Sequence, residues 1–147
     1  LLQRRLGAAI KAVSGLPGVD TAKMGAIGFC FGGMCSILMA RMGAPLQGVV
    51  SFHGLLKIGK KLDDEVKAKI LVLHGQDDPM VPPADIGSFA EEMQRIHAQW
   101  ALYVYPGAKH AFTVPGADDH DLGTVYNENA DRASWATMKR FFEAVLS

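Results

Sequence analysis

Three side chains that act together in nucleophilic catalysis each follow a short apolar run of this sequence. Cys30 stands in "IGFCFGG", Asp78 in "HGQDDPMVP" and His110 in "YPGAKHAF". A histidine can remove the proton of a thiol, and a carboxylate can orient that histidine through its other ring nitrogen. The resulting thiolate can attack a carbonyl carbon. The types and order of these residues therefore predict hydrolysis through a cysteine nucleophile.

The elements that must position these residues alternate between helix and strand. Apolar periodicity, with Gly and Pro at the turns, marks their boundaries. Residues 57–69 are predicted to form a loop or a helical turn, and residues 108–124 a loop. The alternation predicts a single α/β domain over 1–147, a three-layer sandwich with a mostly parallel sheet. We expect helices over 1–13, 31–42, 83–98 and 127–146, and strands over 23–29, 46–53, 69–75 and 101–107.

All three candidate residues follow the carboxyl ends of predicted strands, which is where parallel sheets carry their sites. Cys30 is expected on a sharp turn between a strand and a helix, where Gly28 and Gly32 avoid side chains that would collide. The start of the following helix has a dipole that favours a thiolate. The backbone amide of Phe31 is the expected hydrogen-bond donor to an oxyanion.

Each of these residues also has a simpler interpretation. A cysteine in a glycine-rich turn can be a small buried hydrophobic residue, an aspartate before a proline is common in turns, and a loop histidine can be exposed and idle. A phosphate-binding loop is not indicated, because "GFCFGG" lacks the G-x-G-x-x-G spacing and no P-loop lysine follows. Three such residues at successive strand ends favour catalysis over coincidence.

Composition limits the classes of partner. The chain has 147 residues, 49% of them hydrophobic and 20% charged, and fifteen basic side chains balance fifteen acidic ones. This predicts a globular protein with no nucleic-acid or membrane partner. Two cysteines do not make a disulfide scaffold, so reduced thiols and a cytoplasmic location are expected. The predicted chemistry needs no metal and no organic cofactor.

The sequence resembles the dienelactone hydrolase family of α/β-hydrolases at "IGFCFGG", "LVLHGQDDPMVP" and "YPGAKHAF". The order of nucleophile, acid and histidine is also that of α/β-hydrolases. The resemblance implies that Cys30 is the nucleophile, Asp78 the acid and His110 the base. Asp78 is preferred to Asp77 because it stands at the aspartate of the "HGxxDPxVP" pattern. The implied substrate is a small-molecule ester or lactone.

The resemblance covers essentially the whole chain but only the C-terminal part of the family's fold, so a truncated α/β-hydrolase fold is expected. Family members carry further strands, a helix and the loop of a second oxyanion donor before this point. Without them the strand over 23–29 is an apolar sheet edge with unpaired backbone groups. We therefore expect a homo-oligomer, or a missing N-terminal segment that pairs with this strand.

Substrate and function stay open in two respects. Dienelactone-cleaving members carry an arginine just past the histidine to bind a substrate carboxylate, whereas Thr113, Val114 and Pro115 follow here; this argues against a lactone acid. The chain could also have lost catalysis and act as an assembly or binding module, since only one oxyanion donor is identified. A peptidase or an acyltransferase on the same scaffold is a further alternative.

Other residues near the predicted site have less specific signals. Phe29, His53 and Phe112 are the expected pocket residues, and Phe31 is a candidate for the same apolar wall. For His53 and His74, hydrogen bonds to loops are the alternative role.

Three further groups are expected to be structural. Cys35 lies about 140° around the helix from Cys30, which argues against paired thiol chemistry. The stretch "ADDHD" over 117–121 is predicted to be a solvated loop rather than a metal site. Core packing is the predicted role of Trp135, Phe141 and Phe142.

Overall fold

The computed structural model of the chain describes residues 1–57, 59 and 66–147. Most of the stretch predicted as a loop or helical turn therefore lies outside the described residues. The elements are α1 (Leu2–Ser14), a 3₁₀ turn η1 (Thr21–Lys23), β1 (Gly25–Phe29), α2 (Phe31–Arg41), β2 (Gly48–Phe52), β3 (Lys69–Gly75), α3 (Pro83–Arg95), β4 (Trp100–Tyr105), β5 (Asp118–Asp119), β6 (Thr124–Val125) and α4 (Glu128–Val145).

Strands β1 to β4 form one sheet in the order β1-β2-β3-β4, and every neighbouring pair is parallel. The last residue of β1, Phe29, is in register with Phe52, the last residue of β2, and Phe52 is in register with Leu73 of β3. The carboxyl ends of the strands therefore meet at one edge of the sheet. The predicted parallel α/β architecture is confirmed.

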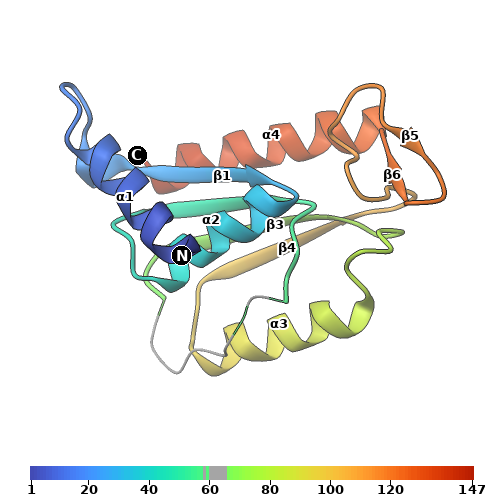
Figure 1. Cartoon of the computed structure of the whole chain (residues 1–147), viewed down its shortest axis with the longest axis horizontal. Helices are drawn as coiled ribbons and strands as arrows, with labels where there is room; N and C mark the ends of the chain where they lie inside the picture. The colour runs from blue at the N-terminus through green and yellow to red at the C-terminus, as the bar shows by residue number, and fades with distance from the viewer. Residues whose placement is uncertain (58, 60–65) are drawn as a thin grey trace.

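Helices cover both faces of this sheet (Figure 1). Val49 of β2 packs in a core with Ile37 of α2 and Met93 of α3. The next residue along the strand, Val50, points to the opposite face and packs with Met138 of α4. This alternation follows from the period of two in a β-strand. It produces three layers, with the sheet between α4 on one side and the other helices on the other.

The position of β1 follows from the sheet order, because β2 is its sole neighbour within the described chain. Its residues alternate between exposed and more buried positions, and Ile27 and Phe29 have exposed fractions of 44% and 39%. The predicted apolar sheet edge is therefore present.

Two details differ from the sequence-based expectation. The segment predicted as a plain loop over 108–124 contains β5, which pairs with β6 in a two-residue antiparallel ribbon. Trp135 was expected in the core of the molecule, but its exposed fraction is 44%. Its ring lies 6.2 Å from that of Phe52 between centroids, so it packs at the rim of the α4 layer. Phe141 and Phe142 are half-buried against the core, as expected.

Candidate active site

Cys30 lies on the turn between β1 and α2 in a backbone conformation that L-residues rarely adopt, with φ 53° and ψ −119°. Its own backbone groups hold it there. The Cys30 N–H donates to the Phe52 carbonyl at 3.0 Å, and the Cys30 carbonyl accepts from the Gly33 N–H at 2.9 Å. Such strain is retained only where the surrounding structure supports it, and it is common at functional sites.

The glycines around Cys30 serve different purposes. A Cβ atom at Gly28 would collide with the Gly32 carbonyl, so the turn requires glycine at position 28. A Cβ atom at Gly32 would meet nothing within 4 Å, so the predicted steric need for that glycine is wrong. The second close approach is at Gly33, where a Cβ atom would lie 2.6 Å from Ser51 Oγ and 2.9 Å from Gly54 Cα.

The three residues singled out in the sequence lie in contact. His110 Nε2 is 3.0 Å from Cys30 Sγ, and His110 Nδ1 is 2.8 Å from Asp78 Oδ2. His110 and Asp78 are buried, whereas Cys30 is partly exposed. A partly exposed cysteine is therefore backed by a buried imidazole and a buried carboxylate.

The carboxylate of Asp78 is fixed through both oxygens. Oδ1 accepts the Met80 N–H at 2.8 Å, while Oδ2 faces the imidazole of His110. Asp77, the neighbouring candidate, is exposed. Of the two aspartates, Asp78 is thus the one that lies against His110.

The proton affinity of His110 reflects competing effects. Burial of the ring lowers its pKa, but the hydrogen bonds to Asp78 and Cys30 and the nearby negative charge outweigh burial and raise the pKa above its ordinary value. An imidazole with a raised pKa is a stronger base. This suits a group that accepts a proton from a thiol.

The loop that carries His110 packs closely on the end of β3. A Cβ atom at Gly75 would lie 2.5 Å from the Ala108 carbonyl oxygen, so glycine at that position lets the loop approach. Gly54 and Gly75 were not singled out in the sequence. The sequence does mark both glycines by a His-Gly pair. The pair in "FHG" directly follows β2, and the pair in "LHG" ends β3.

The backbone amide of Phe31 is available to a ligand. Phe31 is the first residue of α2, where N–H groups have no partner within the helix. Within the described part of the chain, this amide donates to no backbone carbonyl. It is next to the thiol along the chain, at a helix N-terminus that favours negative charge.

The side chains predicted as pocket residues have different surroundings. Phe29 stacks on Phe52, with centroids 4.7 Å apart, and Phe31 is largely exposed. Phe112 is fully buried with Ala108 and Ala130, so it lies in the core beneath the site and does not form a pocket wall.

His53 and His74 are both buried at strand ends close to His110. His53 Nε2 is 2.8 Å from Thr113 Oγ1, which agrees with the alternative of a histidine hydrogen-bonded to a loop. Burial and the nearby His110 lower the pKa of His53 to about 4, and burial lowers the pKa of His74. Both rings are therefore neutral near pH 7.

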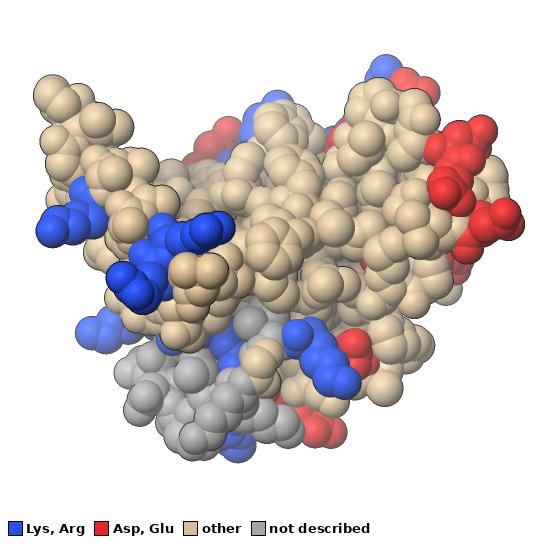
Figure 2. Space-filling view, viewed as in Figure 1, with Lys and Arg blue, Asp and Glu red and all other residues tan. Residues whose placement is uncertain are grey.

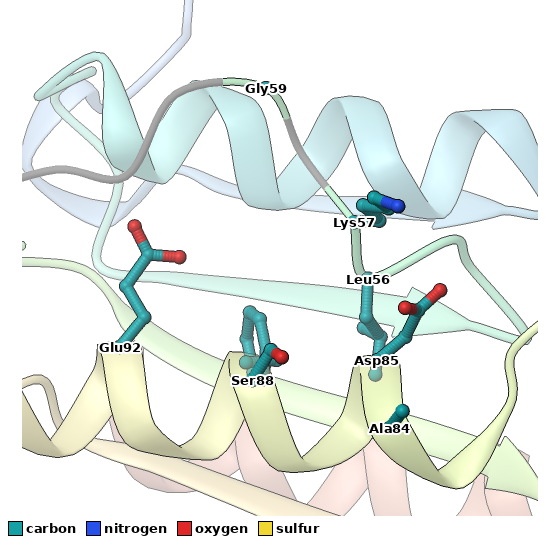
Figure 3. A pocket seen from close by; sticks show the side chains of 8 residues that line it. Leu56, Lys57, Gly59, Ala84, Asp85, Ser88 and Glu92 are labelled. Carbon is teal, nitrogen blue, oxygen red and sulfur yellow. The ribbon is translucent and has the colours of Figure 1, made fainter.

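A separate hollow of about 260 Å³ lies beside α3, and Figure 3 shows Asp85, Ser88 and Glu92 along that helix and Lys57 on the facing segment. None of Cys30, Asp78 and His110 lines it. Glu92 is engaged in a buried ion pair with Arg41 of α2 at 2.7 Å. This hollow is therefore distinct from the candidate catalytic residues.

The described residues contain no cluster of metal ligands, no disulfide and no helix that could span a membrane. No group of three or more His, Cys, Asp or Glu converges there as a metal site would, and the stretch over 117–121 contains β5. Cys30 and Cys35 are both free thiols. No helix in that part of the chain has the length and apolar character needed to cross a membrane.

Charged side chains are unevenly distributed over the face of the molecule in Figure 2. Figure 2 shows Lys and Arg gathered around α1 and Asp and Glu at the opposite end, around β5 and β6. The basic end includes the exposed Arg4 and Arg5, and the acidic end includes the exposed Asp118, Asp119 and Asp121.

Several known proteins are similar to this chain in sequence. A protein of Caenorhabditis elegans described as uncharacterised is 36% identical over 99% of this chain and 95% of its own length. A "Putative carboxymethylenebutenolidase" of Saccharolobus solfataricus is 29% identical over 93% of this chain, which spans only 50% of that relative.

One solved structure similar to this chain is a dienelactone hydrolase-like promiscuous phosphotriesterase from metagenomic libraries. It is 36% identical, with a TM-score of 0.91, and the match covers 99% of this chain and 62% of that one. The family model of the "Dienelactone hydrolase family" matches residues 1–146. The chain therefore belongs to the dienelactone hydrolase family, whose members are hydrolases of the α/β fold.

Proposed function

We propose that this chain hydrolyses carboxylic esters or lactones with Cys30 as nucleophile, His110 as general base and acid, and Asp78 as the residue that orients His110. The observation that carries the proposal is the pair of contacts made by His110, 3.0 Å to Cys30 Sγ and 2.8 Å to Asp78 Oδ2. Family membership supports a hydrolase, and the contacts supply a nucleophile and a base for it.

In the first half of the reaction, His110 Nε2 accepts the thiol proton and Sγ forms a bond to the carbonyl carbon. The carbonyl electron pair moves onto oxygen, where the Phe31 amide donates a hydrogen bond. When this pair returns, the carbon–oxygen bond to the leaving group breaks, and the alkoxide takes the proton from His110. A thioester on Cys30 remains.

In the second half, His110 accepts a proton from a water molecule whose oxygen attacks the thioester carbon. The carbon–sulfur bond then breaks, His110 returns its proton to the sulfur, and the carboxylic acid leaves. Asp78 stays ionised throughout and stabilises the imidazolium that forms twice in each cycle.

The single donor identified for the oxyanion bears on substrate choice. Loss of one donor costs about 3–4 kcal/mol in enzymes that have two. We therefore expect turnover of activated aryl esters, whose leaving groups need little help, and slow turnover of alkyl esters.

The test compares Cys30→Ala with Cys35→Ala in hydrolysis of 4-nitrophenyl acetate. Cys35 is a buried thiol within α2, five positions after Cys30, and makes a matched control. We expect Cys30→Ala to lose activity by about 10³-fold or more and Cys35→Ala to retain it. Equal activity of Cys30→Ala and the parent would refute the mechanism. Acetylation of Cys30, detected by mass spectrometry after a rapid acid quench, would identify the thioester.

A second reaction at the same site is the hydrolysis of phosphotriesters. The similarity of this chain to a promiscuous phosphotriesterase, at 36% identity and a TM-score of 0.91, favours this candidate. An aryl dialkyl phosphate assayed with the parent and Cys30→Ala tests it. Turnover that depends on Cys30 would support the second reaction, and its absence alongside ester hydrolysis would exclude it.

A further inference from the structure

His53 contacts three of the four residues in the loop over 110–113. Its ring lies 5.1 Å from the His110 ring at an interplanar angle of 65°, and 5.1 Å from the Phe112 ring at 78°, both edge-on arrangements. Its Nε2 atom is 2.8 Å from Thr113 Oγ1. One buried side chain thus touches the loop on both sides of its turn.

The loop needs such support because its backbone is strained. Ala111, directly after His110, has φ 58°, and His53 itself has φ 37°. A residue other than glycine in the left-handed region is strained and stays there only when its surroundings hold it. A relaxed Ala111 would reorient the His110 side chain.

His53 is itself fixed to the sheet. Its backbone N–H donates to the Leu73 carbonyl of β3 at 2.8 Å, and only 1% of the residue is exposed. The end of the central sheet thereby determines where the ring of His53 lies. The loop over 110–113 packs on the His53 ring, so its position depends on the sheet. Cys30 directly follows β1 of the same sheet.

We propose that His53 is a positioning residue, which holds the loop over 110–113 through Thr113 and keeps His110 Nε2 directed at the reacting sulfur. The inference rests on the proposed function for its catalytic consequence. Asp78 fixes one end of the His110 ring, and the edge-on contact with His53 restricts the remaining rotation about that hydrogen bond. Nothing in the sequence pattern of the nucleophile, acid and histidine assigns this role.

The contribution matters most after the first chemical step. In the thioester, the sulfur carries no proton and no longer donates a hydrogen bond to His110 Nε2. The ring must nevertheless stay in place to activate water. Because the pKa of His53 is lowered to about 4, the ring beside His110 is neutral and does not repel the imidazolium.

The first test uses the hydroxyl of Thr113, which is only partly buried and can be removed with little risk to folding. Thr113→Val leaves His53 Nε2 without its partner, while Thr113→Ser keeps a hydroxyl. We expect Thr113→Val to lower kcat by about 10- to 100-fold, since a displacement of 1 Å can cost about 10²-fold. KM should change little, and Thr113→Ser should recover most of kcat. Val114→Ala, at the exposed next position, is the control.

The second test combines Thr113→Val with His53→Asn. Asparagine tolerates a positive φ better than most residues, so this change preserves the backbone of the turn. If the two side chains act as a unit, the double variant should be no slower than His53→Asn alone. If the losses of kcat in Thr113→Val and His53→Asn add in the double variant, the proposal is overturned. It is also overturned if these variants have a lower Tm than the parent but the same kcat.

A third readout does not need turnover. Iodoacetamide alkylates Cys30 faster when His110 is in place to accept its proton. We expect Thr113→Val to slow this alkylation at pH 7 several-fold, after correction for labelling of Cys35 measured in Cys30→Ala. An unchanged rate would overturn the positioning role. If the parent hydrolyses no ester yet shows this difference, the proposed function fails and the positioning role stands.

Discussion

The Nε2 atom of His110 lies 3.0 Å from the Sγ atom of Cys30, although 80 positions separate the two residues along the chain. The parallel sheet brings them together. Cys30 directly follows β1, and His110 follows β4 at the same edge, because the strands of the four-stranded sheet are parallel. The parallel direction of the strands therefore brings the residues of the site together, and no local motif could do so alone.

Replacement of Asp78 should impair catalysis without removing the nucleophile. Asp78→Asn keeps the shape of the side chain but removes the charge that fixes and stabilises the His110 imidazolium. We expect kcat/KM to fall by about 10²- to 10⁴-fold, measured with 4-nitrophenyl acetate. Asp77→Asn, at the exposed neighbour, should stay close to the parent. Equal losses in both variants would contradict the assignment of Asp78.

The pH dependence of kcat/KM should report His110. Its pKa is raised above 6.5 by the contacts with Asp78 and Cys30, which outweigh burial, and the base must be neutral to act. We expect activity to fall on the acid side with a midpoint above pH 6.5, and that midpoint to move down in Asp78→Asn. A midpoint that is unchanged in this variant would show that the titrating group is not His110.

Glycine is required at position 28 but not at position 32. Gly28→Ala would force a Cβ atom against the Gly32 carbonyl, so we expect the free energy of unfolding to fall by about 3 kcal/mol. Gly32→Ala, on the same turn, meets open space and replaces a poor helix former, so stability should stay equal or rise by about 0.5–1 kcal/mol. Urea unfolding of both variants checks this, and a similar loss in each would be inconsistent with the turn described.

Stability should be greatest near pH 6.5. Between pH 6.5 and about 4 the unfolded state binds a proton on His53 that the folded state does not, so stability falls as the pH falls. The shift corresponds to about 3 kcal/mol. The raised pKa of His110 acts oppositely, because the folded state keeps a proton above pH 6.5 that the unfolded state has lost. Urea unfolding across this range should show the maximum, and His53→Asn should flatten its acid side.

In the described chain β1 has one unpaired edge, for which the sequence predicts either self-association or pairing with a further N-terminal segment. We propose an antiparallel pairing of β1 with a second copy, since Ile27 is 44% exposed and the strand lacks a second neighbour in the described chain. Because β1 runs from the α1 end toward the β5–β6 end (Figure 1), antiparallel pairing places the basic end of each copy opposite the acidic end of the other (Figure 2).

Light scattering with size-exclusion chromatography checks the pairing. We expect a dimer that weakens as salt concentration rises, and that Ile27→Lys converts to a monomer. Val104→Lys, at a similarly exposed apolar position on β4 at the opposite edge of the sheet, is the control and should remain dimeric. A parent that is monomeric at every concentration would contradict the proposal.

The sequence was sufficient for the alternation of elements and for the three residues that meet at the sheet edge. Strand β3 reads as an unbroken apolar run because both of its faces are covered, and this pattern is visible without coordinates. Parallel strands place their carboxyl ends together, so residues that follow them converge whatever their separation along the chain. The family could be recognised from the same three motifs, although the catalytic roles of Cys30, Asp78 and His110 stay a proposal.

Tertiary structure decided what depends on contacts between distant segments. A Cβ atom would collide with its surroundings at Gly33 and Gly75 but not at Gly32. The atoms that crowd Gly33 and Gly75 belong to distant segments of the chain, so the sequence could not reveal them. The exposure of Trp135 and the burial of Phe112 could not be read from hydrophobicity, since burial depends on which layer covers a side chain. The hydrogen bond between His53 and Thr113 joins residues 60 positions apart, and only the packed sheet and loop bring them within reach.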